Sequence, residues 1–124
     1  MAWAVVGIGS NMQPRTFIAA ALDAMERRFG PLRVSRFVQT EPIGRPGQSR
    51  YLNGAALLET GLAADELAEA LGRIEDDLGR VRTADRFAPR TIDLDLVVYD
   101  GEVLDNDLQA RDFLARAVAE VMEQ

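Results

Sequence analysis

The sequence GRVRTADRFAPRTIDLDLVVY, residues 79–99, joins an arginine-rich segment to a run of residues typical of a β-strand. Asp93 and Asp95 lie two positions apart in that run. Because residues i and i+2 of a strand point to the same face, the two carboxylates are predicted to share one face. The other face is predicted to be aliphatic and to carry Ile92, Leu94, Leu96 and Val98. The stretch therefore predicts a strand that presents an acidic pair on one side and packs on the other.

The acidic pair and the arginines before it indicate one kind of ligand. Two carboxylates on one surface repel each other unless a cation lies between them. Mg²⁺ prefers oxygen ligands and is often held by one or two carboxylates together with substrate phosphates. Arginines bind phosphate oxygens, and four of them precede the strand: Arg80, Arg82, Arg86 and Arg90. The combination favours a polyphosphate bound with magnesium, whereas an acidic pair alone would fit a solvated strand face equally well.

Residues 86–97, RFAPRTIDLDLV, resemble the signature of the 6-hydroxymethyl-7,8-dihydropterin pyrophosphokinases of folate biosynthesis. The sequences GSN at residues 9–11 and YLN at residues 51–53 match further motifs of that family. The resemblance covers nearly the whole chain and fades after Val103. It implies an ATP-dependent diphosphokinase that transfers pyrophosphate to the hydroxymethyl group of the dihydropterin and releases AMP. Because family members usually continue further, it also implies a short, C-terminally reduced member.

The resemblance also implies roles for the charged residues. Asp93 and Asp95 would hold two Mg²⁺ ions that clamp the attacking and leaving oxygens. The residues implied to bind ATP are Arg80, Arg82, Arg90 and Arg111, and those implied to be catalytic are Arg80, Arg90, Asp93 and Asp95. Phosphoryl transfer mainly requires alignment of the reactants and neutralisation of charge, so a chain without histidine can perform it.

A second group of residues is implied to bind the pterin. Tyr51 and Asn53 share a strand face, and an aromatic ring beside a side-chain amide suits a flat heterocycle that forms hydrogen bonds. By the resemblance, Tyr51 packs on the pterin, Asn53 bonds its ring edge, and the loop that precedes them, residues 40–48, supplies backbone hydrogen bonds. The implied pterin-binding residues are Thr40, Ile43, Tyr51, Asn53 and Phe113.

The composition excludes several classes of chemistry. The 124 residues contain no cysteine, histidine or lysine, which excludes disulfides, zinc–thiolate sites, Ser–His or Cys–His catalysis and Schiff-base chemistry. The formal charge of −6 argues against a general nucleic-acid binder, since affinity for a phosphate backbone is largely electrostatic. No apolar run reaches the roughly 18 residues of a membrane-spanning helix, and no signal peptide is predicted. A single cytoplasmic domain, residues 1–124, is predicted, with no nucleic-acid or membrane partner and an undetermined oligomeric state.

The order of the predicted elements points to an α+β fold. Strands are predicted over residues 3–9, 32–39 and 51–58 and around the acidic pair, and helices over residues 14–29, 65–78 and 113–122. The helix over residues 65–78 is predicted to carry an apolar stripe of Leu67, Leu71, Ile74 and Leu78. Prolines and glycines predict a loop over residues 40–48, and Asp100-Gly101 predicts a turn. The order β-α-β-β-α-β plus a C-terminal helix is that of a ferredoxin-like antiparallel sheet with helices on one face.

Three local features have simple structural interpretations. Gly7 and Gly9 are interpreted as sites where the first strand packs closely against a helix. Ser10 and Asn11 are interpreted as turn residues that cap the following helix. Glu75, in the second helix, is interpreted as a solvated charge, although Ile74-Glu75 also matches the pattern of the resembling family ahead of its arginine loop.

Two other functions stay open at the level of the sequence. Asp105-Asn106 stands where the family commonly has a His-Tyr pair, and Thr83 replaces a lysine. These departures favour, as the alternative, a catalytically weak or inactive paralogue that binds a pterin or nucleotide. A ferredoxin-like regulatory or RNA-binding module is the third possibility. It would need aromatic side chains on a basic face, and an acidic chain with Trp3 and Tyr51 supplies that poorly.

Overall fold

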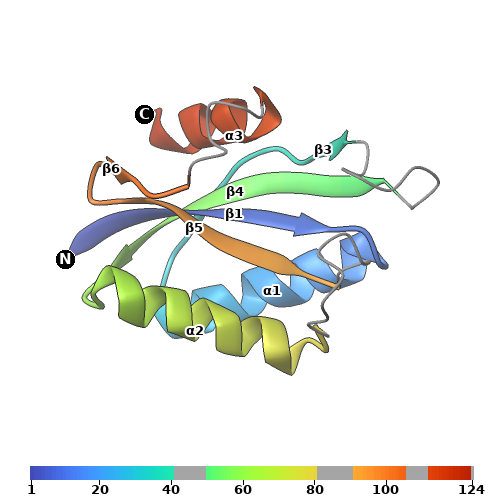
Figure 1. Ribbon diagram of the computed structural model, residues 1–124, viewed down its shortest axis with the longest axis horizontal. Coiled ribbons are helices and arrows are strands. Elements are labelled where there is room, and N and C mark those ends of the chain that lie inside the picture. Colours follow the sequence, from blue (N-terminus) through green and yellow to red (C-terminus); the bar gives the residue numbers. More distant parts are fainter. Residues whose placement is uncertain (41–49, 81–90, 106–111, 124) are drawn as a thin grey trace.

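The strands in the described part of the chain form an antiparallel sheet that lies between two layers of helices (Figure 1). The computed structural model describes residues 1–40, 50–80, 91–105 and 112–123. The elements are β1 (Ala2–Ser10), α1 (Pro14–Phe29), β2 (Arg33–Val34), β3 (Val38–Thr40), β4 (Tyr51–Thr60), α2 (Ala64–Asp77), β5 (Asp93–Tyr99), β6 (Glu102–Val103) and α3 (Asp112–Met122). The strand order is β2-β4-β1-β5-β6, and β3 also pairs with β4.

The helices are divided between the two faces of the sheet. Helices α1 and α2 lie side by side on one face, and α3 covers the other (Figure 1). The predicted ferredoxin-like α+β fold with an additional C-terminal helix is confirmed. None of the helices in the described ranges has the length and apolar character needed to cross a membrane.

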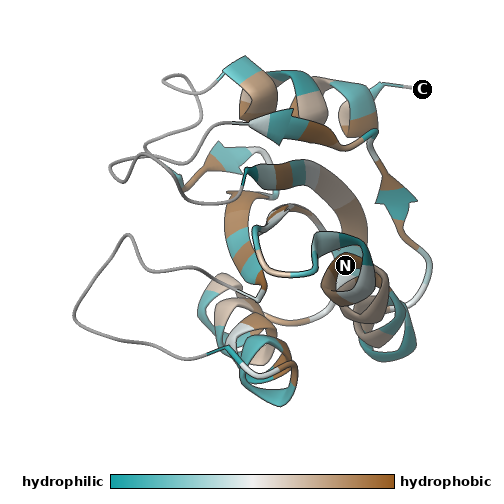
Figure 2. Cartoon of the chain, turned by 90° about the vertical axis from the view of Figure 1, so that its right-hand side faces the viewer, coloured by the Kyte–Doolittle hydropathy of each residue, from teal (hydrophilic) through white to brown (hydrophobic). Residues whose placement is uncertain are grey.

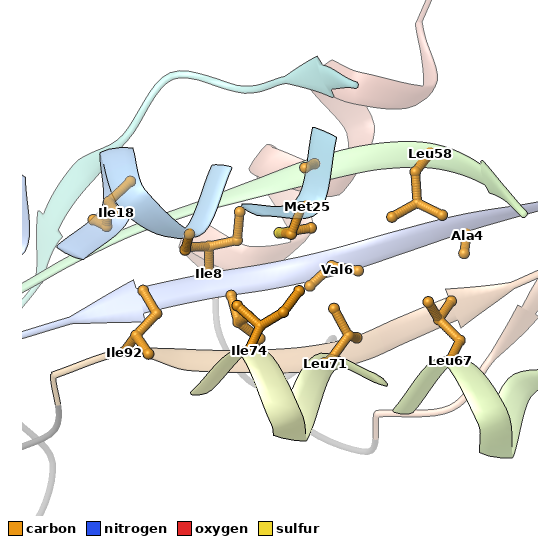
Figure 3. Close-up of a cluster of buried hydrophobic side chains, with 13 residues drawn as sticks. Ala4, Val6, Ile8, Ile18, Met25, Leu58, Leu67, Leu71, Ile74 and Ile92 are labelled. Carbon is orange, nitrogen blue, oxygen red and sulfur yellow. The ribbon is translucent and has the colours of Figure 1, made fainter. Parts of the chain in front are cut away.

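The larger core cluster lies between the sheet and the α1–α2 layer (Figure 3). Alternate residues of β1 point into it because side chains of a strand alternate between faces. The predicted apolar stripe of α2 meets them, with Leu67, Leu71 and Ile74 buried at helical spacing. The side chains of β1 and β4 that belong to this cluster are Ala4, Val6, Ile8, Ala56 and Leu58. This face of the sheet is therefore a continuous packed core.

A register shift in β5 changes which side chains share a face. Val6 pairs with Leu96, whereas the adjacent Val5 pairs with Val98, so β5 has one extra residue at this point. Such a bulge reverses the alternation of side chains beyond it. Val98 was predicted to lie with the aliphatic residues of the main core, and that prediction is wrong. Val97 and Val98 instead both pack in the second core cluster, under α3.

The predicted strand over residues 32–39 is interrupted. It forms two short strands, β2 and β3, with Ser35 between them. The Ser35 hydroxyl accepts a hydrogen bond from the Ala55 backbone N–H at 2.8 Å, while the Ser35 N–H donates to the Ala55 carbonyl at 2.9 Å. A side-chain oxygen thus takes the place of a backbone acceptor, which breaks the regular ladder. Phe37 then covers Gly54, where a Cβ atom would lie 2.8 Å from the aromatic ring.

The start of α1 also differs from the prediction. Gln13, with φ of 45°, precedes the first helical residue, and no side chain caps the helix. The Ser10 hydroxyl instead bonds the backbone of Met12 within the turn. Ser10 and Asn11 are buried at the end of β1. The predicted turn is therefore present, and Gln13, not Ser10 or Asn11, occupies the N-cap position of α1.

Candidate active site

The polar residues of interest gather at the end of the sheet where β1 finishes and β4 and β5 begin. Figure 2 looks directly at this end, with the sheet between α3 and the pair of helices α1 and α2. Gly9 of β1 pairs with Asn53 of β4 on one side and with Asp93 of β5 on the other. Residues opposite each other in antiparallel strands lie on the same face. The register therefore aligns the predicted pterin-binding amide and a predicted metal ligand in one row across the sheet.

A second row lies one step further into the sheet. Gly7 pairs with Ala55 and with Asp95, so Asp93 and Asp95 both lie opposite glycines of β1. Asp93 is half-buried and Asp95 is exposed. Because the bulge in β5 begins only after these residues, the prediction that the two carboxylates share one face is consistent with the register. Their role as metal ligands stays a prediction.

Tyr51 and Asn53 lie together over Gly9. A Cβ atom built on Gly9 would lie 2.6 Å from the Asn53 Oδ1 atom and 3.8 Å from the Tyr51 Cδ1 atom. The absence of a side chain at Gly9 therefore leaves the space that the amide occupies. Gly9 was predicted to pack against a helix, and it instead supports these two side chains. The prediction does hold for Gly7, where a Cβ atom would lie 3.3 Å from Leu114 of α3.

The Asn53 amide has a defined partner. Its Nδ2 group donates a hydrogen bond to the Thr40 hydroxyl at 2.6 Å, between the paired strands β3 and β4. Thr40 was expected to contribute backbone groups only. The contact adds a side-chain role, because it orients the amide that faces Gly9.

Arg80 connects α2 to the acidic strand. Its Nη1 atom lies 3.3 Å from the Asp93 Oδ1 atom and 3.1 Å from the Glu75 Oε2 atom. The side chain is 15% exposed, so the guanidinium group is largely enclosed. The structure thus places one of the predicted phosphate-binding arginines directly beside a predicted metal ligand.

Glu75 is the residue that sequence reasoning misplaced. It was interpreted as a solvated charge, but it is only 5% exposed and accepts a hydrogen bond from the Leu94 backbone N–H at 2.7 Å. The helical pattern indicates the direction of this side chain, although it does not show the partners that make its burial possible. Glu75 follows Leu67 and Leu71 at intervals of four, which places it on the buried face of α2.

An open groove of about 750 Å³ borders the acidic strand. One wall comes from the first turns of α2, one from β5, and one from the residues after β6. Its lining residues are Ala64, Asp65, Ala68, Leu94, Asp95, Leu96, Leu104 and Asp105. The groove therefore combines apolar side chains with the exposed carboxylate of Asp95.

Known proteins are similar to this chain over most of its length. The family model for 7,8-dihydro-6-hydroxymethylpterin-pyrophosphokinase matches residues 5–123. The chain belongs to this family. A 2-amino-4-hydroxy-6-hydroxymethyldihydropteridine pyrophosphokinase of Pseudomonas aeruginosa is 39% identical, over 94% of this chain and 78% of that protein. Pyrophosphokinases of the same description from Haemophilus influenzae (36% identical, 86% of this chain and 68% of that protein) and Bacillus subtilis (30%, 98% and 78%) are also similar.

Family membership confirms the main functional prediction. The protein is a pyrophosphokinase of the folate pathway, an enzyme class that uses ATP and a pterin substrate. The regulatory or RNA-binding module is disfavoured by the same finding.

Several predicted site residues fall outside the described part of the pyrophosphokinase. These are Ile43, Arg82, Arg86, Arg90 and Arg111. Phe113 lies in the first turn of α3, half-buried, and packs against the second core cluster. The next residue, Leu114, contacts the space above Gly7, so this turn of α3 lies close to the site end of β1.

Proposed function

We propose that this pyrophosphokinase transfers the β,γ-pyrophosphoryl group of ATP to the hydroxymethyl oxygen of 6-hydroxymethyl-7,8-dihydropterin at the end of the sheet marked by Gly9. The observation that carries the proposal is the row formed by Asn53, Gly9 and Asp93. Strands β4 and β5 lie about 10 Å apart, or two strand spacings, because β1 runs between them. A pterin held by Asn53 would extend over Gly9 and direct its hydroxymethyl group towards β5. The row thus supports a site in which the ring-binding amide and the acidic pair serve one substrate.

The donor set of the acidic strand fits magnesium. Within the described ranges, no cluster of three or more acidic side chains forms a complete protein cage. Mg²⁺ commonly uses one or two carboxylates and completes its shell with phosphate oxygens and water. We assign this role to Asp93 and Asp95, with two ions as expected from the sequence. Bound there, magnesium would neutralise charge on the transferring phosphates and assist loss of the alcohol proton.

The arginines complete the polyphosphate site in this proposal. Arg80 lies beside Asp93 and presents a planar set of N–H donors, which suits phosphate oxygens. Arg82, Arg90 and Arg111 are assigned the same role from the sequence alone. Phosphate groups held between these cations and the acidic strand would be aligned with the alcohol, which is the main requirement of the reaction.

The groove along β5 is the proposed position of the nucleoside part of ATP. Leu94, Leu96 and Leu104 provide apolar surface, and Asp95 lies at the same groove. An ATP molecule placed there would have its phosphates next to the acidic pair. On the other side of Gly9, Tyr51 and Phe113 would pack on the pterin, while Thr40 and Ile43 would supply hydrogen bonds from the neighbouring backbone.

The decisive experiment measures AMP formation from ATP, Mg²⁺ and 6-hydroxymethyl-7,8-dihydropterin. Asp95→Asn keeps the size of the side chain but removes its charge, and it is expected to lower kcat about a hundredfold or more. Asp100→Asn is the matched control, because Asp100 lies at the far end of β5 and asparagine tolerates its φ of 49°. An Asp95→Asn variant as active as the control would refute the proposed metal site.

The same assay separates the alternative function. If the wild-type protein binds the dihydropterin or ATP in calorimetry but forms no AMP, it is the inactive paralogue considered from the sequence. The single-domain organisation over residues 1–124 and the cytoplasmic location belong to the same proposal. The packing of α1, α2 and α3 on one sheet supports the former, and cell fractionation tests the latter.

A further inference from the structure

Glu75 is a buried carboxylate next to the proposed active site. It lies in the last turn of α2 and is 5% exposed, whereas the following Asp76 and Asp77 are exposed. Removing a carboxylate from water is unfavourable unless hydrogen bonds and an opposite charge compensate. The groups that compensate for the burial of the Glu75 carboxylate are therefore the groups that this residue can hold in position.

The contacts of Glu75 join three elements of the site. Its Oε2 atom accepts from the Leu94 N–H at 2.7 Å and lies 3.1 Å from Arg80 Nη1. Leu94 is the residue between the two aspartates of β5. The Arg80 backbone N–H also donates to the Glu75 carbonyl at 3.1 Å. Arg80 is thus attached to Glu75 through both its backbone and its side chain, and the acidic strand is attached at Leu94.

The arrangement also determines how charge is distributed. The same Arg80 Nη1 atom lies 3.3 Å from Asp93 Oδ1, so the guanidinium is shared between two carboxylates. With Glu75 ionised, the charges of Glu75 and Arg80 cancel, and the pair Asp93 and Asp95 retains a formal charge of about −2 for a divalent cation. Without Glu75, Arg80 would become the counter-ion of Asp93 and would oppose metal binding.

The orientation of the guanidinium leaves donors for a ligand. Within the described ranges, the buried Arg80 Nε atom has no hydrogen-bond partner. A buried donor without a partner is unfavourable and suggests that a ligand completes its hydrogen bonding. Because the guanidinium is planar, fixing Nη1 on Glu75 also fixes the directions of the remaining N–H groups.

We propose that Glu75 is a positioning residue for pyrophosphoryl transfer. Its buried carboxylate holds Arg80 against the start of β5, so that the guanidinium serves the phosphates instead of neutralising Asp93. The inference rests on the proposed function of Arg80 and Asp93. If Glu75 only stabilised the fold, its substitution would leave the Mg²⁺ dependence of the reaction unchanged. Its effect on kcat would also not depend on the presence of Arg80.

A double-mutant cycle with Arg80 tests this positioning role. Glu75→Gln preserves the size of the side chain and an acceptor for the Leu94 N–H but removes the charge. It is expected to lower kcat about tenfold and to raise the Mg²⁺ concentration for half-maximal activity severalfold. In an Arg80→Ala background, the same change is expected to alter kcat less than about twofold and to leave the Mg²⁺ dependence unchanged, because the group that Glu75 positions is gone.

Matched controls separate positioning from stability. Glu69→Gln removes an exposed carboxylate of the same helix, paired with Arg73, and is expected to leave kcat and the Mg²⁺ dependence unchanged. Thermal unfolding confirms that each variant is folded under assay conditions. If Glu75→Gln does not fold, the cycle is repeated with Glu75→Asp, which keeps the charge but shortens the side chain. For the inference to hold, the effects of Glu75→Asp and Arg80→Ala on kcat must also be non-additive.

Two outcomes overturn the inference and are distinguishable from failure of the proposed site. In the first outcome, the losses of kcat caused by Glu75→Gln and Arg80→Ala multiply independently in the double variant. In the second, Glu75→Gln leaves the Mg²⁺ dependence unchanged. Either result shows that Glu75 has a structural role only. If Asp95→Asn is fully active, the metal site itself is misplaced. If Asp95→Asn is inactive and the cycle is additive, only the role of Glu75 is wrong.

Discussion

On the face of the sheet that α1 and α2 cover, β1 contributes Val6 and Ile8 to a core of large aliphatic side chains. On the opposite face, the neighbouring residues of the same strand are Gly7 and Gly9. Gly7 leaves room for Leu114 of α3, and Gly9 leaves room for polar side chains of β4. Because side chains alternate along a strand, one short segment supports the core with half of its residues and the proposed ligand site with the other half. The comparison indicates that substitutions on the two faces should affect different properties.

The largest expected change in stability comes from the α1–α2 face. Leu71→Ala removes a side chain that is 1% exposed, and it should lower the free energy of unfolding by about 2–5 kcal/mol. Turnover per folded molecule should stay unchanged, since Leu71 has no part in the proposed site. Urea unfolding and assays below the melting temperature measure the two quantities. Met122→Ala, at an exposed position of α3, is the control with a small expected effect.

A smaller loss of stability but a clear loss of pterin binding is expected at Gly9. Gly9→Ala places a methyl group 2.6 Å from the Asn53 Oδ1 atom. This is too close for two non-bonded atoms, so the amide must move. The free energy of unfolding should fall by about 1–3 kcal/mol. Calorimetry should show pterin affinity reduced about tenfold or more, whereas Gly61→Ala, where the nearest contact is an ordinary 3.6 Å, should bind normally. Unchanged pterin affinity in a folded Gly9→Ala variant would contradict the proposed place of the ring.

The smallest effect is expected from the hydrogen bond that orients Asn53. Thr40→Val keeps the shape of the side chain but removes the acceptor of the Asn53 amide. A net hydrogen bond contributes about 0.5–1.5 kcal/mol, so the KM for the pterin should rise between about twofold and tenfold. Thr40→Ser should restore the wild-type KM, because it returns the hydroxyl. An equal rise in the KM for ATP, or no rescue by serine, would show that the contact does not orient a pterin-binding group.

The elements that could be predicted depend on local periodicity. The α2 stripe of Leu67, Leu71 and Ile74 was predicted and is buried, because a helix of 3.6 residues per turn places these positions on one side. Asp93 and Asp95 were predicted to share a strand face for the same kind of reason. Helix α1 begins at Pro14 and ends at Phe29 as predicted, since proline fits the first turn and Gly30 ends it.

The features that could not be predicted depend on contacts between distant residues. Val98 lies on the opposite face from the predicted one because β5 has an extra residue in its pairing with β1. No local pattern in β5 predicts this extra residue. Ser35 interrupts a strand because its hydroxyl meets the Ala55 N–H, twenty residues away in the chain. Gly9 was assigned to helix packing, since the sequence does not say which side chain will lie above a glycine.

By itself, the sequence determined the family and the α+β order of elements and predicted the residue types of the proposed site, because motifs and side-chain periodicity are properties of the local chain. Only the tertiary structure decided that Asn53 and Asp93 meet across Gly9 and that Glu75 is buried between Leu94 and Arg80. The reason is that strand register and the burial of a charge are determined by the packing of segments far apart in the chain. A carboxylate on a helix stays in water or enters the interior according to the partners that the fold brings to it.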